Sequence, residues 1–119
     1  MAKITAGQVV ARVDASVPNP YPMQDKLRWL TEAEGLVRRE IFGSTGELLP
    51  LREDSPLTAP MPYESLYERF VEAQLHYAQG ELDRYNSAAA AWNGTFLAYK
   101  DFVSRTAQPG KERRTIKFY

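Results

Sequence analysis

The clearest pattern in this chain is a pair of apolar stripes between Tyr63 and Val103, one on each side of Gly80. In both stripes the apolar residues follow one another at spacings of three and four, which places them on one face of an α-helix. Gly80 favours the end of the first helix, and the acidic Glu81 and Asp83 favour the start of the second. The pattern therefore predicts an antiparallel helical hairpin. Its seam is expected to contain Tyr63, Leu66, Phe70, Tyr77, Tyr85, Trp92, Phe96 and Tyr99.

Two further helices are predicted before this hairpin. Thr5 is a suitable N-cap for a short helix that carries three valines on one side, and the prolines within residues 18–22 prevent this helix from continuing. The next helix is expected to begin near Pro22 and to end near Gly43. Its apolar face contains Met23, Leu27, Leu30, Val37 and Ile41. The fold class predicted is mostly α, a small bundle of about four helices in a single domain.

Two segments lack a helical pattern. Residues 43–62 contain four prolines, and loops longer than about 12 to 15 residues are uncommon in small domains and often functional. We expect this loop to project from the bundle, although the apolar pairs 41–42 and 48–49 leave open a small β-hairpin within it. Residues 107–119 are expected to form an extended tail, which either adds to another protein as a strand or hook or is disordered.

Composition narrows the function classes. The 119 residues suit one domain, and the 15 basic and 15 acidic residues cancel, so the chain lacks the positive field that attracts nucleic acid or anionic membranes. The absence of cysteine excludes disulfides, thiolate zinc sites and cysteine nucleophiles. No stretch approaches the roughly 18 apolar residues of a membrane span. We therefore expect a soluble protein made in the cytoplasm, with no membrane partner and no sequence-specific nucleic acid.

Residues suited to catalysis are few. His76 is the only histidine, so a metal site there would depend on carboxylates. The glycine-containing segment 43–47 lacks the lysine of a phosphate-binding loop and is better explained as a turn. Glu32 and Glu34 lie two positions apart on a helix, where side chains diverge, and both are expected to face solvent. The sequence predicts no catalytic site, no metal and no cofactor, and hence a protein that is not an enzyme.

One feature, a surplus of aromatic residues, points to assembly instead. Nine of the fourteen aromatic residues lie between Tyr63 and Phe102, more than one seam can bury, so a second surface is expected to pack on the helix of Trp29 or on another subunit. An acidic stripe, spaced by four residues, is either solvated or paired with arginines of a neighbouring subunit. The candidate inter-subunit or partner contacts are Glu64, Glu68, Glu72, Arg38, Arg39, Arg105, Lys111, Arg113, Arg114, Phe118 and Tyr119.

An ordered set of short motifs runs through the second half of the chain. These motifs are Pro60-Met61-Pro62-Tyr63-Glu64-Ser65-Leu66-Tyr67, Glu72-Ala73, Gly80-Glu81, Arg84-Tyr85-Asn86, Trp92-Asn93, Phe96, Tyr99 and Arg105. Together they resemble a family of small tailed-phage proteins described as head-tail connectors or adaptors. Weaker similarity extends over residues 26–34, whereas residues 43–55 are not covered.

The resemblance implies a mostly helical structural protein that catalyses no reaction. It implies a homo-oligomeric ring, twelvefold to match a portal, that docks beneath the portal protein of a filled capsid. It further implies contact with the next neck or tail-completion protein, and a location in the virion neck after synthesis in the host cytoplasm. The alternative is a soluble dimeric helical regulator, with DNA binding as one form of it. A DNA-binding helix should carry clustered basic residues, whereas the second helix mixes arginines with glutamates.

Overall fold

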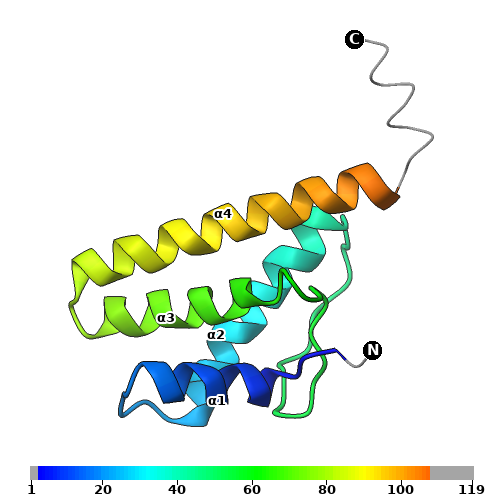
Figure 1. Cartoon of the computed structure of the whole chain (residues 1–119). Coiled ribbons are helices and arrows are strands. Elements are labelled where there is room, and N and C mark those ends of the chain that lie inside the picture. The colour runs from blue at the N-terminus through cyan, green and yellow to red at the C-terminus, as the bar shows by residue number, and fades with distance from the viewer. Residues whose placement is uncertain (1–2, 108–119) are drawn as a thin grey trace.

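Four α-helices account for most of the chain in the computed structural model, which describes residues 3–107 (Figure 1). The helices are α1 (Ala6–Ser16), α2 (Met23–Leu36), α3 (Ser65–Ala78) and α4 (Leu82–Ala107), and a π-helical turn η1 (Val37–Ile41) extends α2. The mostly α fold class and the number of helices are confirmed. The predicted tail lies almost wholly outside the described residues.

Helix α1 begins where the sequence predicted. The Gln8 N–H donates to Thr5 Oγ1 at 3.3 Å, and the Thr5 N–H donates to Gln8 Oε1 at 2.9 Å, so two backbone donors at the helix start are satisfied reciprocally. Val9, Val10 and Val13 are buried on one face of this helix. The chain leaves the helix at Ser16, immediately before the proline-rich connection to α2.

Helices α3 and α4 form the predicted antiparallel hairpin (Figure 1). Gly80 occupies the left-handed region at φ 76°, a conformation that costs glycine little and that other residues rarely adopt. The N–H groups of Gly80 and Glu81 donate to the carbonyl oxygens of Tyr77 and His76 at 3.1 and 2.9 Å. These bonds close the end of α3 and turn the chain directly into α4, which continues beyond the length of α3.

The long loop between η1 and α3 differs from the prediction. Its second part lies against the start of α1: Ser55 O accepts from the Ala6 N–H at 2.9 Å, and the Leu57 N–H donates to Ile4 O at 2.9 Å. Leu57 is fully buried. The expectation that residues 43–62 project is therefore corrected for residues 53–59, because their backbone groups and apolar side chains are bound by the bundle. The only pairing in this part of the described chain is an isolated bridge between Thr5 and Pro56, so no β-hairpin forms there.

This attachment requires a small residue at the start of α1. The Gly7 N–H donates to Glu53 O at 2.8 Å, and a Cβ atom at position 7 would lie 2.9 Å from the same oxygen. Glycine therefore permits the loop backbone to approach the first turn of α1.

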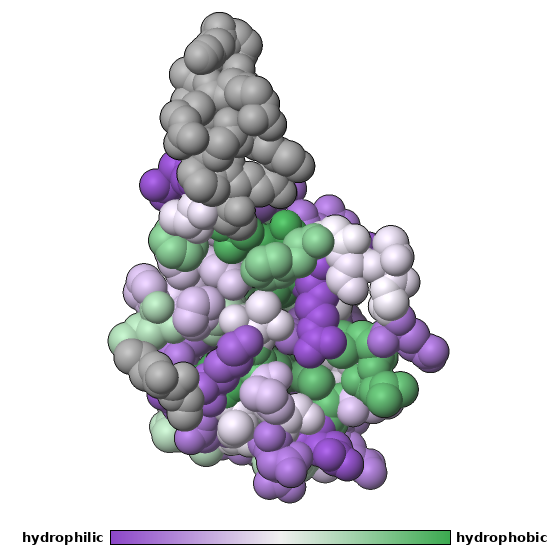
Figure 2. Space-filling view, turned by 90° about the vertical axis from the view of Figure 1, so that its right-hand side faces the viewer, coloured by the Kyte–Doolittle hydropathy of each residue, from purple (hydrophilic) through white to green (hydrophobic). Residues whose placement is uncertain are grey.

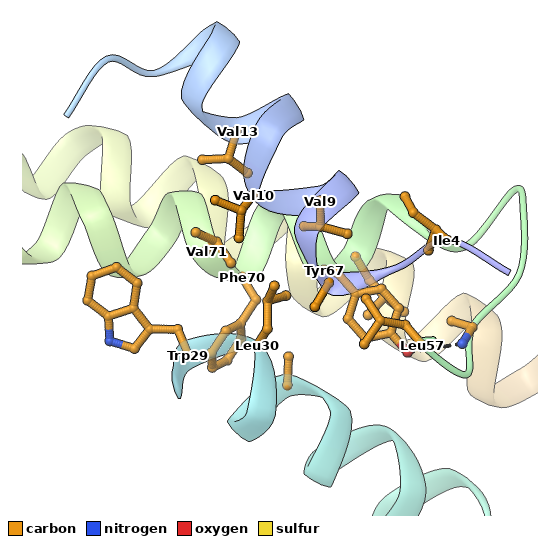
Figure 3. Close-up of a cluster of buried hydrophobic side chains, with 14 of the residues drawn as sticks. Ile4, Val9, Val10, Val13, Trp29, Leu30, Leu57, Tyr67, Phe70 and Val71 are labelled. Carbon is orange, nitrogen blue, oxygen red and sulfur yellow. Dashed lines mark hydrogen bonds between the residues drawn. The ribbon is translucent and has the colours of Figure 1, made fainter. Parts of the chain in front are cut away.

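The core lies where α1, α2, α3 and the attached loop meet (Figure 3). Figure 3 shows valines of α1 and Leu57 of the loop pointing toward Leu30 of α2 and Tyr67 of α3. All of these side chains are fully or almost fully buried. Helix α3 thus contributes to two interfaces, one with α4 and one with α1 and α2, and it is the central element of the fold.

Candidate functional site

The middle of the hairpin seam is an aromatic stack between α3 and α4. The ring centroid of Phe70 lies 5.0 Å from that of Trp92 in an edge-on arrangement, and Trp92 lies 5.0 Å from Phe96. Leu66 is fully buried, whereas Trp92 and Phe96 are only partly covered. The structure therefore brings Phe70, Trp92 and Phe96 together against the core cluster that contains Leu66, and it leaves Trp92 and Phe96 partly exposed.

A second aromatic group closes the end of the hairpin that is opposite to its turn. Tyr63 lies 5.1 Å from Tyr99 and 5.3 Å from Phe102, measured between ring centroids. Phe42, the residue after η1, lies 6.2 Å from Tyr99. The surplus of aromatic residues is thus shared between α4, the residues before α3 and the end of the α2–η1 segment.

The hairpin tip is the most exposed part of the seam. Tyr77 and Tyr85 face each other at 5.3 Å across the turn, and 63% of Tyr77 remains exposed. Leu82, the first residue of α4, is 60% exposed. Two large apolar side chains therefore stand in solvent at this end of the molecule.

The acidic stripe is bound within the chain. Arg12 of α1 donates to Glu64 at 2.9 Å and to Glu68 at 3.2 Å, and Arg69 donates to Glu72 at 2.6 Å. The two bonds to carboxylates raise the pKa of the Arg12 guanidinium above its ordinary value. The sequence prediction did not include Arg12, because it lies about 50 positions before its partners and nothing local marks the pairing.

The predicted arginine contacts have different surroundings. Arg38 donates through Nε to Glu34 at 3.0 Å, and Arg105 donates to Asp101 at 3.0 Å one helical turn earlier. Arg39 is exposed, and no ion pair involves it within residues 3–107. The remaining candidate contacts, Lys111, Arg113, Arg114, Phe118 and Tyr119, lie outside the described residues.

A buried carboxylate, Glu34, joins α2, α3 and the loop. It is fully buried and accepts hydrogen bonds from the Tyr67 hydroxyl at 2.6 Å, the Thr58 hydroxyl at 2.6 Å and Arg38 Nε at 3.0 Å. The Thr58 N–H adds a bond at 3.3 Å, and the Ala59 N–H donates to the Tyr67 hydroxyl at 3.0 Å. Each carboxylate oxygen therefore has at least two donors, which compensates for the loss of water.

The prediction that Glu34 faces solvent is wrong, whereas Glu32 is exposed as expected. Leu27, Leu30, Glu34 and Val37 follow one another at spacings of three, four and three, so Glu34 occupies a position on the apolar stripe of α2. This spacing was the signal in the sequence that could have indicated the burial of Glu34. Lys26 is buried in the same helix and donates to Asp14 at 2.7 Å, another long-range pair that the sequence did not indicate.

This arrangement predicts a loss of stability at alkaline pH. Burial, with Glu34 nearby, raises the pKa values of the Tyr67 and Tyr99 phenols above the ordinary value of 10.0. A raised folded-state pKa stabilises the protein fully below the pKa of an unfolded tyrosine, and this contribution is lost as the pH rises above it. We expect the free energy of unfolding to fall above about pH 10, by up to ~1.4 kcal/mol per pH unit for Tyr67, with a contribution of the same sign from Tyr99.

Urea unfolding between about pH 8 and about pH 11 measures this slope. The variant Tyr67→Phe should have a shallower slope than the parent chain, and Tyr77→Phe, which changes an exposed tyrosine, should retain the parent slope. Identical slopes for the two variants would contradict the assignment.

The polar groups that are common in catalytic sites have structural partners. His76 is mostly buried, and its Nδ1 lies 2.7 Å from Glu81 Oε1 across the hairpin turn. Within residues 3–107 the acidic and histidine side chains form no group of three or more that could hold a metal ion. The helices of the described chain also include none with the length and apolarity needed to cross a membrane.

Comparisons of this chain with protein-family models, with curated proteins and with solved structures give no match.

Proposed function

We propose that this chain is a virion structural protein, a head-tail connector or adaptor that forms a ring beneath the portal and links the filled capsid to the neck or tail. The family resemblance of residues 60–105 supports this proposal. Some of these residues also form the hairpin, since Gly80 makes the turn and Trp92 and Phe96 pack in the seam. Tyr67 instead joins α3 to α2 through the buried Glu34.

The observation that carries the proposal is the placement of exposed apolar side chains at opposite ends of the hairpin. Tyr77 and Leu82 are exposed at the tip, whereas Phe42 and Met61 are exposed in the segments before α3 that reach the other end, where Phe42 and Tyr63 pack against Tyr99 (Figure 1). Where exposed apolar side chains adjoin one another, they often mark interaction surfaces. An adaptor must contact more than one component, and two separate apolar ends suit this task.

The same arrangement suits a homo-oligomeric ring. Head-to-tail contacts between copies join two different surfaces and close into a ring when the rotation between copies permits. In this proposal twelve copies match the portal, and the ring also binds the next neck or tail-completion protein. The protein is made in the host cytoplasm and incorporated into the virion neck, and it catalyses no reaction.

The proposal is tested by deleting the gene and by measuring binding to the purified portal assembly. Without the protein, filled heads should lose their genome or fail to accept tails. In vitro, Leu82→Ser should weaken binding to the portal or to the next copy by roughly tenfold, because an apolar contact at the centre of an interface contributes more than 1 kcal/mol.

Leu97→Ser is the matched control, because Leu97 is 52% exposed on α4 and lies away from the hairpin tip. It should retain binding, and both variants should melt as the parent chain does. Tailed particles at normal yield from the deletion strain would contradict the proposed connector function.

A further inference from the structure

The loop after η1 leaves three adjoining hollows beside α2. Their volumes are about 250, 430 and 410 Å³, the first two share Arg38, Glu47 and Leu48, and the last two share Pro50 and Leu51. They follow one another from the end of η1 toward the first half of α2. Figure 2 looks at the side of the molecule on which this loop lies and shows apolar side chains at the surface among polar ones. The three hollows thus adjoin one another in a row, a partly apolar path along the surface.

The side chains that line the path differ in polarity and charge from one hollow to the next. The lining of the hollow farthest from η1 includes Leu27, Glu32 and Leu51, and Glu47 lines the two hollows nearer to η1. Within residues 3–107 neither Glu32 nor Glu47 takes part in an ion pair. By contrast, three of the four arginines along the path have carboxylate partners: Arg28 with Asp25, Arg38 with Glu34, and Arg52 with Asp54.

The charges of the chain are unevenly divided. Residues 3–107 contain eleven basic and fourteen acidic residues, a formal charge of −3, whereas residues 108–119 contain four basic and one acidic residue, a formal charge of +3. The basic residues of this terminal segment precede or alternate with the apolar Ile116, Phe118 and Tyr119. Opposite charges favour contact between the segment and the rest of the chain.

We propose that residues 108–119 bind along these hollows in their own chain. The order of the residues fits the order of the hollows. Arg113 and Arg114 pair with Glu47 near η1, whereas Lys117 pairs with Glu32 and Phe118 enters the apolar hollow lined by Leu27 and Leu51.

The distances permit this contact. Phe42, which directly precedes the loop, packs 6.2 Å from Tyr99 of α4, so the start of the path lies near the last turns of α4. Twelve extended residues span about 40 Å, whereas the 14 residues of α2 span about 21 Å. Because both partners belong to one chain, the effective concentration is high, on the order of millimolar.

The test places a photoreactive benzoyl-phenylalanine at position 118 of the full chain and maps the cross-links by mass spectrometry. Cross-links to residues 24–32 and 50–51 are expected. The double variant Glu32→Arg and Glu47→Arg should lower their yield roughly fivefold or more, because each exposed ion pair contributes up to about 1 kcal/mol and becomes repulsive. Added salt should also lower the cross-linking yield of the parent chain.

Glu53→Arg is the matched control, because Glu53 is an exposed glutamate of the same loop that does not line the hollows. It should leave the cross-linking yield unchanged. A mixture of isotope-labelled and unlabelled chains shows whether the linked peptides come from one chain. Cross-links scattered over the surface, cross-links between chains, or equal yields for the double variant and the control would each overturn the proposal. The test uses the purified chain alone, so its outcome is independent of the connector function.

Discussion

Glu34→Ala is expected to lower the free energy of unfolding by about 3 to 5 kcal/mol. The substitution leaves the buried Tyr67 hydroxyl and the Thr58 hydroxyl without their acceptor, and it removes the partner of Arg38. Buried donors without acceptors cost the full penalty of losing water. Thermal and urea unfolding measure the effect, which corresponds to a decrease in Tm of about 12 to 20 °C for a chain of this size.

Glu32→Ala is the control, because Glu32 lies two residues away in the same helix and is exposed. It should change stability by no more than about 1 kcal/mol, the contribution of one exposed ion pair. The double variant Glu34→Leu with Tyr67→Phe should lose less stability than the sum of its single changes, by about 1 to 3 kcal/mol, since it removes donor and acceptor together. Equal losses for Glu34→Ala and Glu32→Ala would show that the buried network does not stabilise the fold.

Phe70→Ala is expected to cost about 3 to 5 kcal/mol, because the phenyl ring packs in the core and against the hairpin partner helix at the same time. Phe70 is 9% exposed and belongs to the buried cluster shown in Figure 3, and its ring meets Trp92 of α4 at 5.0 Å. The cavity left by this change would face both interfaces of α3. Urea unfolding with a constant m-value provides the measurement.

Leu97→Ala should be nearly neutral, because Leu97 is half exposed on α4. Trp92→Ala should cost less than Phe70→Ala, because Trp92 is only partly covered. An altered oligomeric state of Trp92→Ala with unchanged melting would place this side chain at an interface between copies instead. A loss below about 1 kcal/mol for Phe70→Ala would contradict the described packing.

The helices were predictable because their signals are local. Thr5 and Gln8 specify the start of α1 within one turn, and Gly80 supplies the left-handed residue that ends α3. The hairpin follows from two apolar stripes joined by a turn of a few residues. None of these features requires knowledge of which distant residues meet.

The remaining features depend on partners that are far apart in the sequence. Arg12 binds Glu64 and Glu68 more than 50 positions later, and Glu34 binds Tyr67 33 positions later. The prolines of the loop indicate the conformation of its own backbone but not its contacts with other segments. The prediction that the loop projects therefore missed its hydrogen bonds to Ile4 and Ala6. Periodicity indicated which helix faces are apolar, but it did not indicate that a carboxylate on such a face would accept four hydrogen bonds.

The attachment of α1 has a consequence for the order of events during translation. The partners of Ile4, Ala6, Gly7 and Arg12 described above lie between residues 53 and 68, so they leave the ribosome long after α1 itself. An isolated helix of 11 residues is marginal in water, even with its capping box. Helix α1 therefore gains these contacts only after residues 53–68 have been synthesised, and until then its contacts within the fold are with α2.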